Sequence, residues 1–433
     1  GFPMKRMKSA RAFPIVLLAP LAAFLGPHRS PSALRGVARH AAAVSLPVLV
    51  PGSEGPQWWD ARNSASPVVL PPKKPGGEWR MWYYGRSGTQ WAKGVDAFLP
   101  TGRVGAASSL DGERWKRVEG PLEGGACFDP TDDEDAFDCV HVGVGDVVEL
   151  PNGTLWMYYF GGGLDGVPNK GIRMQIGLAT SDDGQRWQRR GAPVLAPGGE
   201  GDFDEVFVAW PRVLPPWQTA SVAGIPDGKW YMSYHTASFK EGIQWSAGAA
   251  FSDDGVEWTK VDGPVLVGGE TGAWDEKGVG VRHPVVTPDG RLIMIYEAVD
   301  AAMDHSLGLA ESEDGIRWTK VDFPEAQPGG PFLRKGELQS WDDRVVGTPY
   351  LIPPTGDEEP WRLYYVGEAK EKPGLSIGLA ESFDDGLRLW RKRRAGADKL
   401  PKTNNEGLYS RVWKKGERSQ TRDVKVESID LDL

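Results

Sequence analysis

The residues best suited to chemistry are a glutamate, two histidines and an arginine near the ends of apolar segments. Arg282 and His283 are adjacent in GVGVRHP, Glu297 follows in LIMIYEA, and His235 occurs in WYMSYHT. A carboxylic acid whose pKa is raised by burial is suited to donate a proton, whereas arginine and histidine side chains bind anionic groups. What these side chains do together depends on the elements that hold them.

A short motif of Ser, Asp, Gly and Trp recurs five times along the chain. Its copies are SSLDGERW, TSDDGQRW, FSDDGVEW, SEDGIRW and the longer SFDDGLRLW, with aspartates Asp111, Asp183, Asp254, Asp314 and Asp385. Internal repeats fix an architecture and are sought before other signals. A catalytic aspartate is needed once, whereas this one occurs in every copy. We therefore interpret it as structural, with its carboxylate bound to N–H groups of its own turn.

Each repeat has the same order of segments ahead of this turn. An aromatic residue and an aspartate lead into a short apolar strand, a Gly or Pro turn, an aromatic-rich second strand and a third strand such as IGLATS. Short β-rich runs separated by Gly, Pro and Asp-Gly indicate antiparallel hairpins. Four antiparallel strands in each of five repeats predict an all-β fold, a five-bladed β-propeller over residues 54–394.

The repeat register predicts which residues lie at the mouth of the propeller, where the inner strands converge. Before the strand proline, or Gly145 in the second repeat, it places Ser66, Val144, Trp210, His283 and Thr348, and one step earlier Ala65, Gly143, Ala209, Arg282 and Gly347. The second strands end at the same mouth with Tyr84, Phe160, His235, Glu297 and Val366. Residues that depart from the repeat average mark a site. These are Arg282, His283, His235 and Glu297, followed by Asp146, Arg212 and His141, with Trp210 and Tyr84 as aromatic binding residues.

The two ends of the chain differ from the repeats. Residues 1–53 have seven Lys or Arg, no acidic residue and the apolar run FPIVLLAPLAAFLG. This pattern predicts a targeting presequence for the secretory pathway, either a plain signal peptide or one followed by a transit-like segment for a plastid. Residues 395–433 have no repeat pattern, and we expect a charged C-terminal extension.

The charge of the remaining chain excludes some partners. Removing the seven positive residues of the presequence from a net charge of −9 leaves −16 for residues 54–433. So acidic a surface repels nucleic acid and anionic membranes. We expect a monomer whose partner is a carbohydrate.

The two cysteines and an acidic run lie together. In an oxidising compartment Cys127 and Cys139 could close a short loop through a disulfide. The run Asp132, Asp133, Glu134 and Asp135 between them is acidic enough for calcium but lacks the spacing of a calcium loop. With no Cys/His spacing for zinc either, we expect no catalytic metal and no cofactor, and a structural calcium at the acidic run stays an alternative without a supporting motif.

Five repeats whose third and fourth strands meet at LA-x-S-x-D-G-x-x-W resemble the five-bladed glycoside hydrolases, the arabinanase, levansucrase and invertase superfamily of families 43, 32, 62 and 68. The resemblance covers about residues 55–394. For families 43 and 32 it implies an Asp where this chain has Ser66, and for family 43 an Asp and a Glu where Trp210 and Arg282 stand. Only Asp146 matches an acidic position of that pattern, and it is not one of the three catalytic acids.

Two interpretations of the function follow. Glycoside hydrolysis normally uses two opposed carboxyl groups, so in the first Glu297 is the proton donor, with Asp146 as its partner. Other carboxyl groups considered as the partner are Asp60, Glu205, Glu276 and Asp343. In the second, the protein is a non-catalytic propeller that binds a glycan or a protein at the same mouth. Two opposed carboxyl groups there would favour the first, and Arg and His beside aromatic residues would favour the second.

Overall fold

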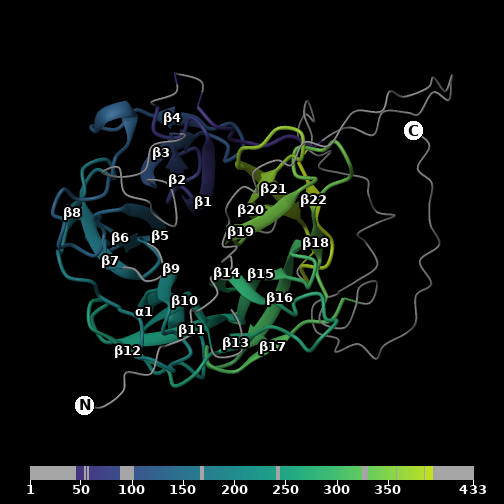
Figure 1. Cartoon of the computed structure of the whole chain (residues 1–433). Helices are drawn as coiled ribbons and strands as arrows, with labels where there is room; N and C mark the ends of the chain where they lie inside the picture. Colours follow the sequence, from purple (N-terminus) through teal and green to yellow (C-terminus); the bar gives the residue numbers. More distant parts are fainter. Residues whose placement is uncertain are drawn as a thin grey trace, which may run out of the picture. The chain divides into compact units, whose positions relative to one another are not determined.

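The structure is a computed structural model that describes residues 45–52, 55, 58–87, 102–165, 170–239, 244–323, 330–356, 358–384 and 386–393. Within these residues the protein is all-β, with one four-residue helix, α1 (Pro216–Thr219), and a 3₁₀ turn at Glu123–Gly125. No helix in this part of the chain is long and apolar enough to cross a membrane. Figure 1 shows groups of strands that follow the chain around a common centre. Residues 1–44 of the expected presequence and all of the expected C-terminal extension lie outside the described residues.

The first two repeats each form a four-stranded antiparallel sheet, in the order β1-β2-β3-β4 and β5-β6-β7-β8. The strands of the first are β1 (Asn63–Leu70), β2 (Trp79–Arg86), β3 (Arg103–Ser109) and β4 (Lys116–Val118). Those of the second are β5 (His141–Glu149), β6 (Leu155–Gly162), β7 (Met174–Ser181) and β8 (Gln188–Arg189).

The third and fourth repeats have the same internal order but share one sheet. The strands of the third are β9 (Phe207–Leu214), β10 (Trp230–Ser238), β11 (Gln244–Ser252) and β12 (Trp258–Lys260), with β13 (Leu266–Val267) paired to β11. Those of the fourth are β14 (Gly278–Val286), β15 (Leu292–Val299), β16 (His305–Ser312) and β17 (Trp318–Lys320), with β18 (Leu333–Arg334) paired to β16. The last repeat is again a four-stranded sheet of β19 (Val345–Ile352), β20 (Trp361–Glu368), β21 (Ser376–Ser382) and β22 (Arg391–Lys392). The predicted all-β class and four-stranded antiparallel sheets are confirmed.

One close backbone approach joins the third and fourth repeats. Trp245 in β11 pairs in parallel with Gly278 in β14. Gly278 has a φ of 122°, and a Cβ atom there would lie 2.2 Å from the carbonyl oxygen of Trp245. Glycine is therefore required at this junction, since any other residue would push the two strands apart.

The first strands of the repeats form a closed ring. β1 contacts β5, β5 contacts β9, β9 contacts β14, β14 contacts β19, and β19 contacts β1. Buried residues from different repeats pack between the sheets, and Val68, Tyr159 and Tyr364 belong to one hydrophobic cluster. This arrangement is consistent with a β-propeller, in which the first strand of each sheet lies nearest the axis.

The N-terminal residues complete the last sheet. The Leu49 and Ile377 backbones pair as an antiparallel bridge, as Phe128 and Leu195 pair with β3 and β7 in earlier repeats. Leu49 thus pairs with the third strand of the last repeat, as residues that follow the fourth strand do in the earlier repeats. Residues 45–50, which the sequence led us to assign to the presequence, are therefore part of the folded ring.

The repeated Ser-Asp-Gly-Trp turn is structural, as expected. In the second repeat Asp183 Oδ1 accepts hydrogen bonds from the Gln185 and Arg186 N–H groups, both at 2.8 Å, and these bonds lower the pKa of Asp183 to about 2. Asp111, Asp254 and Asp314 have the same bonds. In the last repeat the accepting carboxylate is that of Asp384, and Asp385 lies outside the described residues.

A second repeated feature is the aspartate that precedes each first strand. We call Asp60, Asp138, Asp204, Asp275 and Asp342 the lead aspartates, and all five are buried. Each forms an ion pair with a fourth-strand cation, respectively Arg117, Arg189, Lys260, Lys320 and Lys392. Four of them also accept a hydrogen bond from a second-strand tyrosine. The lead aspartates therefore link the start of the first strand to the fourth strand of the same repeat.

The cysteines are not bonded to each other. Cys127 and Cys139 are both buried thiols, so the disulfide considered from the sequence is not formed. Burial raises the pKa of the Cys127 thiol to about 12, which keeps it protonated. Among the described residues, which include the acidic run 132–135, no three His, Cys, Asp or Glu side chains are grouped to hold a metal ion.

Candidate functional site

The register of the fourth repeat differs from the one expected. In the first repeat Ala65 pairs with Tyr84, and the pairing resumes at Val68 after a bulge of two residues. In β14 the bulge comes between Val279 and Arg282, so Gly280 lies level with Glu297. Counting back from Pro284 had assigned Arg282 and His283 to the mouth positions. The residues at these positions lie two earlier in the chain. Gly280 and Val281 occupy the mouth positions instead, because the bulge precedes the proline rather than ending at it.

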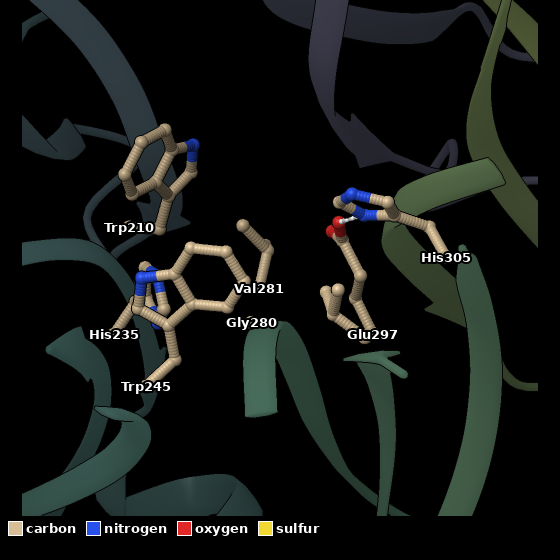
Figure 2. A pocket seen from close by; sticks show the side chains of 8 residues that line it. Trp210, His235, Trp245, Gly280, Val281, Glu297 and His305 are labelled. Carbon is tan, nitrogen blue, oxygen red and sulfur yellow. Dashed lines mark hydrogen bonds and ion pairs between the residues drawn. The ribbon is translucent and has the colours of Figure 1, made fainter. Parts of the chain in front are cut away.

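A small pocket lies where the third and fourth repeats meet. It has a volume of about 20 Å³ and is lined by Trp210, His235, Trp245, Gly280, Val281, Glu297, Val299 and His305. Figure 2 shows the two tryptophans and His235 on one side and the Glu297 and His305 side chains on the other. A space of this size has room for roughly one water-sized group, so it fits a single substituent of a larger ligand.

Glu297 is the carboxylate of the pocket, and both of its oxygens are bonded. Oε1 lies 2.6 Å from Nδ1 of His305, and Oε2 accepts a hydrogen bond of 2.8 Å from the Thr348 N–H group. The side chain of Glu297 is 4% exposed and that of His305 is 14% exposed. The carboxylate thus fixes the orientation of the imidazole, and Figure 2 shows this bond between the two side chains.

A glycine in the neighbouring repeat lets Glu297 reach its backbone donor. A Cβ atom on Gly347 would lie 2.7 Å from Glu297 Oε2, closer than such contacts occur. The next residue, Thr348, has a φ of 41°, a strained value for a β-branched residue. Ser66 and Trp210 share this conformation at φ values of 48° and 45°, so the strain belongs to the bulge of these inner strands.

The opposite wall is aromatic and has polar atoms without partners. His235 is buried against Phe207 and Trp210, and burial followed by repulsion from Arg282 lowers its pKa to about 3. The ring is therefore neutral near pH 7. Within the described structure, His235 Nδ1 and Trp245 Nε1 have no hydrogen-bond partner. A ligand that enters the pocket would meet the Trp210, His235 and Trp245 side chains on one side and the Glu297–His305 pair on the other.

Asp146 lies in a different group of residues, which we call the inner-strand cluster (Asp146, Arg212, His283 and Tyr350). The Val213 N–H group donates to Asp146 Oδ2 at 2.8 Å, and the Val147 N–H group and the Tyr350 hydroxyl donate to Oδ1 at 2.9 and 3.3 Å. Burial raises the pKa of Asp146 to about 6, against the attraction of Arg212. Asp146 does not line the Glu297 pocket.

The remaining predicted site residues on the inner strands are buried and bonded to other strands. The His283 ring is stacked on Tyr350 at 4.0 Å, and its Nδ1 accepts a hydrogen bond from the Leu351 N–H group. Burial holds the pKa of His283 well below its ordinary value. Arg212 lies over the Tyr350 ring at 4.8 Å, while Arg282 donates to Ser233 Oγ and to the Trp210 carbonyl. None of the three lines the pocket.

His141 and Tyr84 lie in the first two repeats, also away from the pocket. His141 Nε2 is 2.8 Å from the Gly171 carbonyl, and burial lowers the pKa of His141 to about 4. The Tyr84 ring is 6.3 Å from that of Phe160, with the Arg86 guanidinium 5.4 Å from its centre. Of the predicted site residues, Glu297, His235 and Trp210 therefore line the pocket, and the others do not.

The other carboxyl groups considered as partners for Glu297 have structural bonds. Asp60 is a lead aspartate bound to Arg117. Glu205 accepts from the Gly201 and Phe239 N–H groups, and Glu276 from Gly272. Asp343 accepts from the Gln339 and Lys370 N–H groups. Glu297 is thus the one carboxyl group among the described residues that line the pocket.

Two pocket residues were missed as site residues, and the repeat register contains the signal that finds them. Trp245 pairs with Ala237 and His305 pairs with Val299, each two residues beyond a site residue of the second strand. The two residues therefore hold the same position in the third strands β11 and β16. All of the predicted site residues were taken from the first and second strands of the repeats, and none from the third.

Comparisons with known proteins were made for sequence and for structure. No family model and no curated protein matches the sequence. Solved structures do match. A glycosyl hydrolase from Bacteroides ovatus is 18% identical with a TM-score of 0.54, over 82% of this chain and 95% of that one. A family-43 glycoside hydrolase, described as thermostable, is 17% identical with a TM-score of 0.52, over 78% of this chain and 95% of that one.

A third match comes from the GH130 family of mannoside phosphorylases, which is described as containing glycoside hydrolases that target β-1,2-mannosidic linkages in Candida mannan. It is 19% identical with a TM-score of 0.53, over 79% of this chain and 96% of that one. At these identities the likeness is one of fold. The chain has the fold of glycoside hydrolases, family 43 among them, as the repeat motif led us to expect.

Proposed function

We propose that the chain is a five-bladed β-propeller that binds a carbohydrate at the pocket between its third and fourth blades. The five sequence repeats and the closed ring of five first strands support the blade number. The shared fold with glycoside hydrolases supports a carbohydrate as the ligand. Fold alone does not determine function, so the proposal depends on the chemistry of the pocket.

The composition of the pocket is the observation that carries the proposal. Two tryptophans and two valines offer apolar surface, and Glu297 with His305 offers hydrogen bonds at one edge. Aromatic faces with a few placed polar groups are typical of small-molecule sites. Hydrolysis by the usual route needs two facing carboxyl groups, whereas this pocket has one among the described residues, and both of its oxygens are bonded. Binding is therefore favoured over hydrolysis.

The size of the pocket limits how the sugar binds. With room for about one small group, the pocket receives a single substituent, such as a hydroxymethyl or methyl group, while the rest of the sugar extends outward.

Binding is tested with the purified full chain on an array of neutral and uronate-containing oligosaccharides, followed by calorimetry on any ligand found. The Trp245→Ala variant is expected to lower affinity at least tenfold, because it removes one wall of the pocket. Trp217→Ala is the matched control, since Trp217 lies on α1, is 47% exposed and does not line the pocket. Equal affinity of both variants and the parent would show that the ligand binds elsewhere, and an array without any binding would overturn the function itself.

Hydrolysis is the second candidate, and one observation favours it. The pKa of Asp146 is raised to about 6, the range in which a carboxyl group serves as a general acid near neutral pH. In this alternative Glu297 and Asp146 are the acid pair, as the sequence argument had it. Release of reducing sugar from aryl glycosides, abolished in both Glu297→Gln and Asp146→Asn, would favour hydrolysis. Release that persists in either variant would exclude this pair.

Four further features are part of the proposal. The protein is expected to be monomeric, to need no cofactor, and to avoid nucleic acid because of its acidic charge. Residues 1–44 are expected to direct it into the secretory pathway, to the extracellular space or onward to a plastid. Size-exclusion chromatography with light scattering and a fluorescent fusion of the N-terminal segment check these expectations.

A further inference from the structure

Two arginines in the ring of inner strands are completely buried and form no close ion pair with a carboxylate of the described residues. Arg212 and Arg282 have no exposed surface. Arg282 donates from Nε to Ser233 Oγ at 2.9 Å and from Nη2 to the Trp210 carbonyl at 2.8 Å, and Arg212 donates from Nη1 to the Gly145 carbonyl. Neither forms an ion pair with a carboxylate in the described part of the chain. Nη1 of Arg282 and Nε and Nη2 of Arg212 have no hydrogen-bond partner there.

This situation is unusual within the same molecule. All five lead aspartates form ion pairs with a fourth-strand cation, so buried charges in the repeats are neutralised. A buried charge without a partner is strongly unfavourable. Asp146 is the carboxylate of the inner-strand cluster, and its bonds go to backbone N–H groups and to Tyr350. One carboxylate cannot neutralise two guanidinium groups.

The two guanidinium groups lie on the same face of one sheet. Arg212 in β9 is the cross-strand partner of Ser233 in β10. Side chains of directly paired residues project from the same face, with Cβ atoms about 4.5–5.5 Å apart. Because Arg282 of the next repeat donates to the Ser233 hydroxyl, its guanidinium reaches the face from which Arg212 projects. Strands β9 and β14, which carry the two arginines, are also in contact.

We propose that Arg212 and Arg282 together bind a small monovalent inorganic anion of the size of chloride. The available groups are all N–H donors, which selects an anion over a cation. Complete burial of both side chains restricts the ligand to a small ion and disfavours phosphate or a carboxylate of a sugar. His283 does not compete for it, because its Nδ1 already accepts the Leu351 N–H group. This anion site is separate from the carbohydrate pocket, which neither arginine lines.

Thermal unfolding of the full chain tests the proposal. In a buffer of sodium gluconate, whose anion is too large for the site, addition of sodium chloride at constant ionic strength should raise the melting temperature in a saturable way, by about 3 °C or more. A crystal soaked in sodium bromide should show an anomalous peak within hydrogen-bond distance of both guanidinium groups. No peak, together with equal melting temperatures in the two salts, would overturn the proposal.

Two variants separate anion binding from a general effect of salt. Arg282→Met removes the charge and keeps the length of the side chain, so the chloride response should disappear while the variant in gluconate stays as stable as the parent or becomes more stable. Arg117→Met is the matched control, because it removes a cation that is ion-paired to Asp60. It should be less stable in both salts and keep the full response to chloride. If Arg282→Met keeps the response as well, Arg282 does not hold the anion.

Discussion

The lead aspartates and Glu297 of the pocket are all buried carboxylates, but their bonding partners differ. The lead aspartates recur in all five repeats, and each is paired with a cation. Glu297 occurs once, is bonded to a histidine and a backbone N–H group, and faces the Trp210, His235 and Trp245 side chains across the pocket. The carboxylates that repeat are paired with cations inside the fold, whereas the carboxylate that occurs once lines a pocket.

This difference separates residues that hold the fold from residues that act. Repetition alone identified the turn aspartates as structural, and the hydrogen bonds of Asp183 agree with that reading. The contrast predicts that substitutions in the repeated polar groups will lower stability, and that those in the pocket will change binding with little effect on stability.

The largest loss of stability is expected from Asp60→Ala. This change removes the acceptor for Ser64 Oγ at 3.1 Å and Tyr83 Oη at 2.8 Å and leaves Arg117 without its ion pair. Breaking a buried pair by removing one partner costs about 3–5 kcal/mol. Urea unfolding should show a lower midpoint with an unchanged slope. The control Asp289→Ala removes an exposed pair with Arg291 and should cost less than about 1 kcal/mol. Similar losses in the two variants would contradict the structural role of the lead aspartates.

The strands were predictable because the repeat supplies the same information five times. Apolar runs, Asp-Gly turns and aromatic second strands recur in the same order in every repeat, and strands β1 to β22 form in that order. The register of β14 was not predictable in this way, since the bulge there is at Gly280 and Val281 and the proline, Pro284, is three residues beyond Val281. A proline marks the bulge in three other repeats, so counting back from Pro284 misplaced Arg282 and His283.

The site was predictable in part for a related reason. Glu297, His235 and Trp210 were found because they depart from equivalent residues on the first two strands. His305 and Trp245 occupy equivalent positions at the start of the third strands, before the LA-x-S pattern, where the repeats have different residues and offer no common type for comparison. The partners of Asp146 come from β9 and β19, and pairings between repeats cannot be read from one repeat at a time.

The next largest effect is a dependence of stability on pH through Asp146. Its folded pKa, about 6, is above the ordinary value of 3.8, so the native state binds the proton more tightly than the unfolded state does. This contribution to stability is complete below about pH 4 and is lost as pH rises to about 6, on the order of 2 kcal/mol. Because other carboxylates titrate as well, the measurement is the difference between the parent and Asp146→Asn in urea unfolding from pH 4 to 7. A difference that does not vary with pH would show that Asp146 is ionised throughout.

A smaller loss is expected in the repeated turn from Asp183→Ala. Two backbone N–H groups lose their acceptor, but they are exposed to water, so the expected cost is about 1 kcal/mol. Since the pKa of Asp183 is lowered to about 2, its contribution is present above about pH 4 and disappears as pH falls toward 2. The neighbouring Asp182→Ala is the control, because Asp182 is exposed and should have little effect at any pH. Equal urea midpoints for the two variants at pH 7 would show that Asp183 does not stabilise the turn.

The smallest effect on stability, with the largest effect on binding, is expected from Glu297→Gln. The amide oxygen of glutamine can accept the Thr348 N–H group, and its NH₂ group can donate to His305 Nδ1, so both hydrogen bonds have a neutral replacement. Stability should change by less than about 0.5 kcal/mol, whereas the amide no longer provides the negative charge that sets the proton position on His305. Affinity for the carbohydrate should then fall about tenfold or more. Glu311→Gln, an exposed glutamate on the same strand as His305, should change neither quantity. A loss of stability in Glu297→Gln as large as that in Asp60→Ala would mean that the pocket carboxylate belongs with the structural aspartates, and the distinction between the two regions would fail.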